Sequence, residues 1–155
     1  MRNTAGIDVG MAPRSGASGG LGAAVMGLLG GRMHPRYEII MQYLELDRFI
    51  TEADLVVTAE GSLDGQTPLG KVPDEVAARA KLAGVPVIAL ACTIGKGVRL
   101  NFEHGIDAFA SIRSKPCSLE DAISGAPKLL SRAAEDAARM VMVGMKLGAR
   151  WRKAA

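Results

Sequence analysis

Residues 53–94 read ADLVVTAEGSLDGQTPLGKVPDEVAARAKLAGVPVIALACTI, and this stretch decides the fold class. Leu55–Val57 and Pro86–Cys92 are short apolar runs, which are typical of strands buried on both faces of a parallel sheet. Between them, Val72–Leu82 has apolar residues at helical spacing and a proline in its first turn. Strand, helix and strand in this order predict a parallel α/β unit with a right-handed crossover.

The flanking sequence extends this pattern in both directions. A third buried strand is expected at Ile106–Ile112, after a connection rich in glycine. Helices are expected at Ser18–Gly31, in two pieces between Tyr37 and Thr51, from Ser118, and from Pro127 onwards. The predicted fold class is therefore α/β, with a parallel sheet of Rossmann or flavodoxin type and flanking helices, in a single domain of residues 1–155.

The composition narrows the classes of partner. Aromatic residues make up 4% of the 155 residues, so stacking platforms for single-stranded nucleic acid are not expected. The net charge of +3 comes from a basic tail at residues 146–155. We interpret this tail as a solvated helix end, with its cations near the negative end of the helix dipole, and prefer this to contact with nucleic acid or an anionic surface.

Two cysteines and the hydropathy pattern bear on the cellular compartment. Cys92 lies in an apolar run and Cys117 in a loop, so we expect free thiols in a reducing compartment. The sequence contains no apolar run of the roughly 20 residues that a membrane span needs. It also lacks a charged N-terminal region followed by an apolar signal core. These features predict a cytoplasmic protein without a membrane partner.

The segment Thr58–Lys71 is the main candidate for a functional loop. It follows a predicted parallel strand at its C-terminal end, where open α/β sheets bind their ligands. Carboxylates, hydroxyls, an amide and a lysine are combined there with glycines, next to a helix N-terminus whose free N–H groups attract anions. We expect this loop to bind a small anionic substrate or a phosphate.

Part of this loop is similar to a phosphate-binding motif. Gly65–Lys71 fits G-x-x-x-x-G-K, but Val72 occupies the next position, where a true P-loop has the Ser or Thr that holds Mg²⁺. Lys71 at a helix start remains a candidate for holding a phosphate or carboxylate. Glu60 and Asp64 could be metal ligands, a general base with its partner, or residues that only order the loop.

A second glycine-rich stretch, residues 15–22, precedes the first predicted helix. It does not meet the spacing of a dinucleotide fingerprint, and no strand is evident before it. Anion binding and tight helix packing remain open as explanations of its glycines. The candidates for nucleotide or phosphate binding in this stretch are Gly16, Ser18, Gly19 and Gly20.

Three segments together resemble the C-terminal part of the bacterial glycerate kinases. They are GASGGLGAA (Gly16–Ala24), ADLVVTAEGSLDGQTPLGK (Ala53–Lys71) and GVPVIALAC (Gly84–Cys92), in the order and spacing of the family. Family members typically show a GAAGGLG-like stretch, a TGEGR-x-D-x-Q-[ST]-x-x-GK loop and a PVIAL-G strand. The resemblance implies ATP-dependent, Mg²⁺-assisted phosphorylation of glycerate to a phosphoglycerate, in a cleft between two α/β domains.

The resemblance also implies roles for individual residues. Lys71 and Asp64 would be the catalytic residues, Lys71 stabilising charge and Asp64 acting as a base or a metal ligand. Glu60 would be the second metal ligand. The residues expected to bind substrate are Thr58, Glu60, Gly61, Ser62, Gln66 and Gly70.

Some features depart from the family pattern. Ala59 and Cys92 stand where the family has glycine, and Ser62 stands where it has an arginine, whose charged, planar fork a serine cannot imitate. Family members are also more than twice as long. The chain therefore resembles an incomplete part of a two-domain kinase, expected to act with an N-terminal partner chain or as a homo-oligomer. The alternative is a catalytically inactive, truncated module that binds small anions or self-associates.

Overall fold

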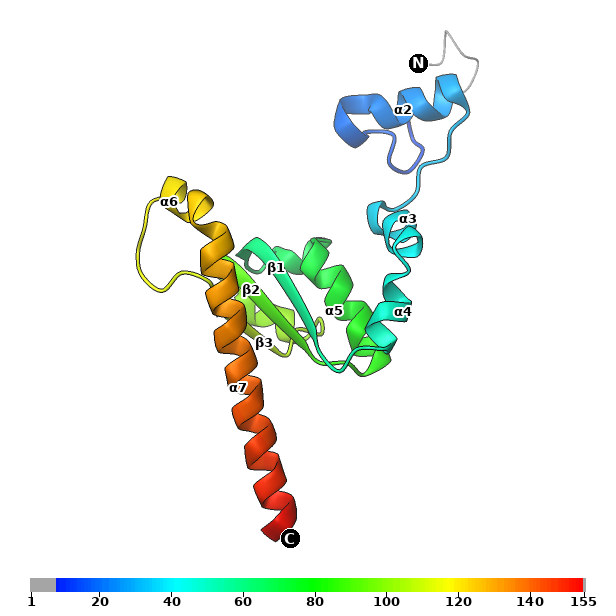
Figure 1. Ribbon diagram of the computed structural model, residues 1–155. Helices are drawn as coiled ribbons and strands as arrows, with labels where there is room; N and C mark the ends of the chain where they lie inside the picture. Colours follow the sequence, from blue (N-terminus) through cyan, green and yellow to red (C-terminus); the bar gives the residue numbers. More distant parts are fainter. Residues whose placement is uncertain (1–7, 155) are drawn as a thin grey trace. The chain divides into compact units, whose positions relative to one another are not determined.

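A computed structural model describes residues 8–154 of the 155-residue chain (Figure 1). The chain divides into two compact units, one running through Leu44 and the other beginning at Glu45. The sheet and the residues of the candidate loop lie in the second unit.

The first unit contains helices α2 (Ala17–Leu29) and α3 (Arg36–Tyr43), close to the predicted bounds. Glycine is required inside α2 at Gly22, because a Cβ atom there would lie 2.3 Å from the carbonyl oxygen of Arg14. Helix α2 ends at Gly30, whose φ of 64° is the left-handed conformation favoured at helix C-termini.

The second unit is built on a three-stranded parallel sheet in the order β1-β2-β3. The strands are β1 (Val56–Leu63), β2 (Val87–Ile94) and β3 (Ala108–Ser111). Val56 lies opposite Val87 in the register, and Ile88 lies opposite Ala108. This arrangement confirms the predicted parallel α/β class.

Helices cover both faces of the sheet (Figure 1). Helix α5 (Val72–Ala83) packs through its fully buried Ala77 and Ala80 on the face that carries Ala89 and Ala91 of β2. Small side chains at these positions allow the helix backbone to approach the sheet closely. Because side chains alternate along a strand, Leu90 faces the opposite side, where α6 (Leu119–Ser124) and α7 (Ala126–Ala154) lie.

The remaining elements complete the core and the ends of the strands. Helix α4 (Leu46–Thr51) packs against α5 and buries Ile50, and two short 3-10 helices follow β1 and β2: η1 (Thr67–Leu69) and η2 (Val98–Phe102). Ser118 caps α6 as predicted, since its hydroxyl accepts a hydrogen bond from the N–H of Asp121 at 3.1 Å.

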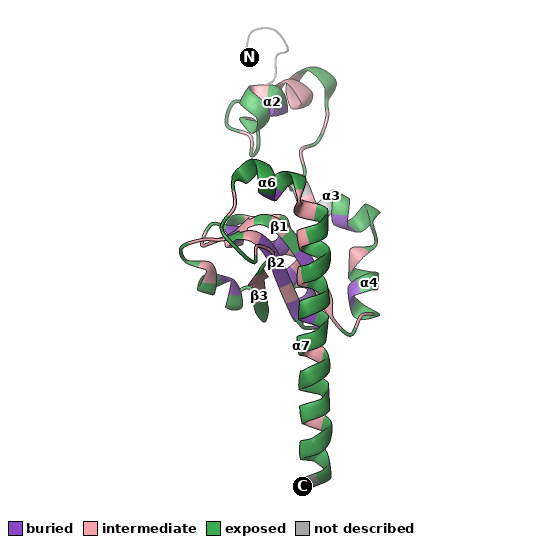
Figure 2. Cartoon of the chain, turned by 60° about the vertical axis from the view of Figure 1, so that its left-hand side comes forward, coloured by how far each residue is buried: buried purple, intermediate pink, exposed green. Residues whose placement is uncertain are grey.

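Two predicted boundaries were wrong. Residues 58–63, expected in the loop, continue β1, because polar side chains at the open end of a strand do not stop its main-chain pairing with β2. Strand β3 is shorter than the predicted Ile106–Ile112. Helix α7 continues past the sheet, and Met140 on it is 64% exposed (Figure 2).

Other expectations can be checked along the described chain. Cys92 and Cys117 are both free thiols. The basic tail forms the last turns of α7, which extends to Ala154. Between residues 8 and 154, no helix is long and apolar enough to cross a membrane.

Candidate functional site

The candidate site lies where β1 ends and the chain turns into α5. A compact turn begins at Asp64, whose main-chain N–H donates to Oγ1 of Thr67 at 3.1 Å while the N–H of Thr67 donates back to the carbonyl of Asp64 at 3.2 Å. Thr67 is wholly buried, so this reciprocal pair satisfies polar groups that water cannot reach. Gly70, with a φ of 97°, ends η1 and leads directly to Lys71 at the N-cap position of α5.

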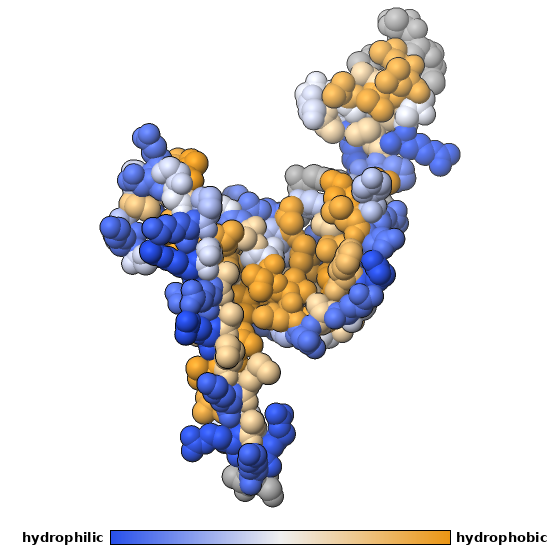
Figure 3. Space-filling model, viewed as in Figure 1, coloured by the Kyte–Doolittle hydropathy of each residue, from blue (hydrophilic) through white to orange (hydrophobic). Residues whose placement is uncertain are grey.

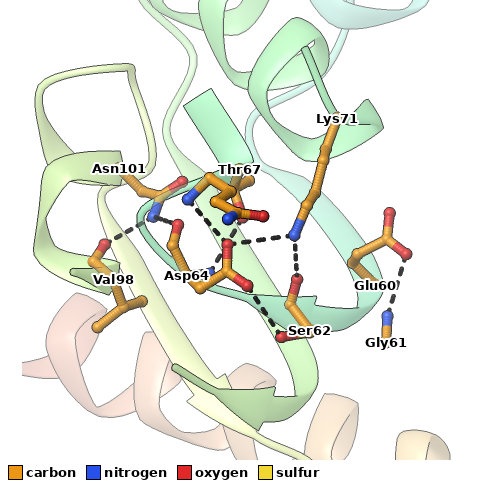
Figure 4. Close-up of polar contacts among 9 residues, drawn as sticks. Glu60, Gly61, Ser62, Asp64, Thr67, Lys71, Val98 and Asn101 are labelled. Atoms are coloured by element: carbon orange, nitrogen blue, oxygen red, sulfur yellow. Dashed lines mark hydrogen bonds and ion pairs between the residues drawn. The ribbon is translucent and has the colours of Figure 1, made fainter. Parts of the chain in front are cut away.

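The ammonium of Lys71 is held at the centre of this turn (Figure 4). Its Nζ lies 3.2 Å from Oδ1 of Asp64 and 3.3 Å from the carbonyl oxygen of Ser62. The side chains of Lys71 and Asp64 are 33% and 26% exposed. An ammonium has three donors, so one N–H beyond these two contacts can reach a ligand from the solvent side.

Asp64 is held as a carboxylate by several donors. Its Oδ1 accepts from the main-chain N–H of Gln66 at 2.9 Å, and its Oδ2 accepts from the hydroxyl of Ser62 at 3.3 Å. The bond from Gln66, followed by the bond and charge of Lys71, holds the pKa of Asp64 below its ordinary value. Asp64 is therefore a fixed negative charge at neutral pH.

The structure adds residues from the loop after β2 that sequence reasoning missed. Asn101 of η2 is wholly buried, and its Nδ2 donates to the carbonyl of Asp64 at 3.0 Å and to that of Val98 at 2.7 Å. A Cβ atom on Gly95 would lie 2.8 Å from the Cβ of Asp64, so only glycine fits there without a shift. Two neighbouring parallel strands end at the same edge of the sheet, and this signal could have pointed to Gly95 but not to Asn101.

The structure brings together some of the predicted residues and separates others. Ser62, Asp64, Gln66 and Lys71 form one hydrogen-bonded cluster. Thr58 is buried within β1, at 8% exposure and opposite Ala89 in the register. The cluster is thus formed by residues 62–71 of the predicted loop.

Glu60 and its neighbour Gly61 lie apart from the cluster. The Glu60 carboxylate accepts a hydrogen bond from the N–H of Gly61 at 3.1 Å, and in Figure 4 it is turned away from Asp64. In the described part of the chain, no three His, Cys, Asp or Glu residues are grouped so that they could hold a metal ion. Mg²⁺ that arrives with phosphates uses only one or two protein carboxylates, so Asp64 and Glu60 fit this role singly.

A hollow of about 700 Å³ opens beside Glu60. It lies between the ends of β1 and β2 and the helices α6 and α7, and Cys92 is on its wall. Hollows of this size are typical of small-molecule sites. Its mainly apolar lining includes Ala59, Leu90, Ile112, Leu119, Ile123 and Leu130.

The second glycine-rich stretch has an unusual backbone at the start of α2. Ser18, Gly19 and Gly20 have φ values of 50°, 69° and 97°, all in the left-handed region. Gly16 occupies the N-cap position, where no side chain caps the helix. The positive φ values explain the two successive glycines, and nucleotide or phosphate binding by these four residues stays a prediction.

Comparisons with known proteins identify similar sequences and a similar structure. Residues 1–142 match the model of the glycerate kinase family. The chain is 41% identical over 133 residues to the glycerate kinase of Halalkalibacterium halodurans, covering 86% of this chain and 35% of that protein. It is 38% identical over 140 residues to the glycerate 2-kinase of Escherichia coli, covering 90% and 37%.

A solved structure gives the same result at the level of the fold. The crystal structure described as glycerate kinase 2 from Salmonella typhimurium LT2 is similar with a TM-score of 0.65 and 36% sequence identity. The similarity covers 85% of this chain and 33% of that one. The chain thus spans about a third of the length of the relatives that it matches.

Proposed function

Because this chain belongs to the glycerate kinase family, we propose that its β1–α5 turn handles the phosphoryl group in the ATP-dependent phosphorylation of glycerate. The observation that carries this proposal is the Lys71 ammonium, fixed by Asp64 and the Ser62 carbonyl at the C-terminal end of β1. The helix N-terminus at the same point adds main-chain N–H groups that favour an anion. A compartment that holds ATP and keeps both thiols reduced fits the expected cytoplasmic location.

The reaction requires positive charge at a defined place. A hydroxyl oxygen of glycerate forms a bond to the γ-phosphorus, while the bond from that phosphorus to the bridging oxygen of ATP breaks and ADP leaves with the electron pair. Negative charge is spread over the phosphoryl oxygens during this step. The third donor of Lys71 can bind one of these oxygens, and a positioned donor of this kind accelerates transfer by about 10²–10³-fold.

Asp64 suits the part of a permanent carboxylate in this scheme. Because its pKa is lowered, Asp64 remains ionised. It is therefore better suited to orienting the attacking hydroxyl than to holding the proton that this hydroxyl loses. That proton then passes to water or to a phosphate oxygen. Mg²⁺ bound with ATP would neutralise phosphate charge, and Asp64 or Glu60 would be its protein ligand.

Substrate binding would involve the polar groups around this cluster. The Gln66 side chain is exposed beside Asp64 and can donate to the carboxylate or a hydroxyl of glycerate. Ser62 already uses its hydroxyl on Asp64, so it does not replace the arginine of the family loop. We therefore expect weaker binding of anions here than in relatives with that arginine.

A chimeric enzyme tests the proposal directly. The part of the Halalkalibacterium halodurans relative that lies outside the match is joined to this chain, and glycerate-dependent release of ADP from Mg-ATP is measured. We expect turnover with this chain, loss of at least 100-fold with Lys71→Ala, and no change with Lys128→Ala, which removes an exposed lysine of α7. Turnover that survives Lys71→Ala would exclude the assigned role of Lys71.

A second candidate function is anion binding without catalysis. It is supported by the one-third exposure of the Lys71 side chain, which leaves a donor accessible in the chain by itself. Phosphate, glycerate or ATP should then raise the melting temperature of the chain, since a ligand that binds only the folded state stabilises it. An inactive chimera together with such a rise would favour this candidate, and no rise with any of the three ligands would exclude it.

A further inference from the structure

The C-terminal half of α7 carries apolar side chains that the rest of the unit does not cover. Ala137, which lies over the sheet, is 5% exposed, but the large apolar residues after it are open to solvent (Figure 2). Figure 3 shows hydrophobic and strongly hydrophilic side chains next to each other along the lower part of this helix. The exposed residues are Met140 (64%), Met142 (55%), Val143 (56%), Met145 (69%), Leu147 (43%) and Trp151 (69%).

Several of these residues form one continuous stripe. Met140, Leu147 and Trp151 follow Ala137 at intervals of three, seven and four residues, which places them on the face that packs on the sheet further up the helix. With Val143 at its border, the stripe exposes roughly 450 Å² of apolar side chain, taking ~150–250 Å² for a large one such as tryptophan. This face is therefore amphipathic but lacks a partner within the described part of the unit.

The charges on this segment all have the same sign. Residues 137–155 contain no Asp or Glu, whereas Lys146, Arg150 and Lys153 recur at four- and three-residue intervals along a neighbouring face. Arg152 adds a fourth cation, while Arg139 is ion-paired with Glu135 at 2.7 Å. The match to the glycerate kinase family ends at residue 142, so most of this basic, apolar segment lies outside it. None of these residues belongs to the β1–α5 turn to which phosphoryl transfer is assigned.

We propose that the last turns of α7 bind the surface of an anionic lipid bilayer. The helix would lie in the plane of the interface, with the stripe of Met140, Leu147 and Trp151 in the boundary between headgroups and acyl chains and the cations on lipid phosphates. Such a helix binds at the membrane surface without crossing the bilayer. The lack of a membrane-spanning segment in the sequence therefore does not contradict the proposal. A purely solvated helix end does not account for the apolar stripe.

Other occupants fit these observations less well. A second copy would bring two segments of only positive charge together, and the stripe falls short of the ~800 Å² per partner that a stable interface buries. Nucleic acid would pair with the cations but leave the stripe exposed, since binding to the phosphate backbone is electrostatic. An anionic membrane surface complements both the charge and the apolar stripe.

The single tryptophan of the chain, Trp151, reports on this binding directly. The whole chain is mixed with vesicles of phosphatidylcholine alone or of phosphatidylcholine and phosphatidylglycerol at 3:1. We expect sedimentation with the mixed vesicles and a blue shift of Trp151 emission, and neither with phosphatidylcholine alone. Raising the salt concentration should release the chain, because electrostatic attraction to the surface is screened.

Variants separate the contributions of charge and of the apolar stripe. Lys146→Gln with Arg150→Gln should weaken binding about five-fold for each cation removed. The matched control, Lys128→Gln with Arg132→Gln on the first half of α7, should leave it unchanged. Met140→Gln with Leu147→Gln should abolish the blue shift although every cation is kept. Far-UV circular dichroism verifies that each variant keeps its helix content.

Four results would overturn the proposal. They are a failure to sediment with the anionic vesicles, equal binding to phosphatidylcholine alone, and binding unaffected by the Lys146→Gln and Arg150→Gln pair while all variants remain folded. The fourth is a blue shift that grows with protein concentration without vesicles, or that appears only with a polynucleotide, which would assign the segment to self-association or to nucleic acid.

Discussion

Replacing Asn101 by alanine tests how the structure fixes Asp64. The wholly buried amide of Asn101 donates to two main-chain carbonyls, those of Asp64 and Val98, and alanine removes both bonds, although the Asp64 carbonyl keeps the N–H of Thr67. A buried acceptor that loses its partner costs about 1–3 kcal/mol, and the Asp64 carbonyl keeps one donor, so we expect the free energy of unfolding to fall by about 1–3 kcal/mol. Because small domains are stable by only about 5–15 kcal/mol, this change is large.

An isosteric substitution makes the test sharper. Asn101→Asp keeps the shape but replaces the donating nitrogen by an oxygen, which faces two carbonyl oxygens and also buries a charge. We expect Asn101→Asp to be less stable than Asn101→Ala at pH 7, and the difference to shrink as the pH falls and the carboxylate is protonated.

Urea denaturation followed by far-UV circular dichroism measures both variants. The midpoint should fall at an unchanged slope, since the slope reports the surface exposed on unfolding. The exposed amide of Gln42 provides a control, and Gln42→Ala should change the free energy by less than about 0.5 kcal/mol. An Asn101→Asp variant as stable as the parent chain would refute the donor role of the Asn101 side-chain nitrogen.

Three further predictions concern the packing and charges around the site. Gly95→Ala should lower the free energy of unfolding by about 1–3 kcal/mol, because its Cβ would lie 2.8 Å from the Cβ of Asp64. Gly61→Ala should not lower it, because no atom lies within 4 Å of the added Cβ. Chemical denaturation of both variants checks this prediction. Arg79→Met removes two ion pairs at 2.8 Å, one to Asp47 of α4 and one to Glu75 of α5 itself. It should cost about 1 kcal/mol in the same assay, since Asp47 is 65% exposed and Glu75 30% exposed, and a loss above about 3 kcal/mol would contradict this expectation. The pKa of Asp64 in the folded state lies below its ordinary value because of the Gln66 N–H and Lys71. The stability advantage of the parent chain over Asp64→Asn should therefore be present above about pH 4 and be lost as the pH falls through the folded pKa. An advantage that grows on acidification would contradict this sign.

The fold class could be predicted because its main signals are local. The apolar runs before and after α5 are continuous, and Gly84 ends the helix between them with a φ of 71°. The end of β1 could not be predicted in the same way. Residues 59–62 are polar or small because they lie at the open end of the sheet, and their pairing with β2 depends on a strand far away in the sequence.

The candidate site was partly predictable for a similar reason. Lys71 and Asp64 are seven residues apart in one connection, so the loop pattern indicated both before their ion pair at 3.2 Å was known. Asn101 is 37 residues from Asp64, and a single asparagine in an irregular segment gives no signal. Thr58 and Glu60 were grouped with the loop because the sequence does not show that the strand continues through them.

The central claim is that Lys71 acts on the charge of the transferred phosphoryl group, and the turnover number of the chimeric enzyme tests this most directly. Lys71→Met keeps much of the side-chain length but removes the charge. We predict that kcat falls by about 10²–10³-fold while the KM for glycerate changes only a few-fold and circular dichroism shows a folded protein. A folded Lys71→Met chimera with an unchanged kcat would contradict the claim.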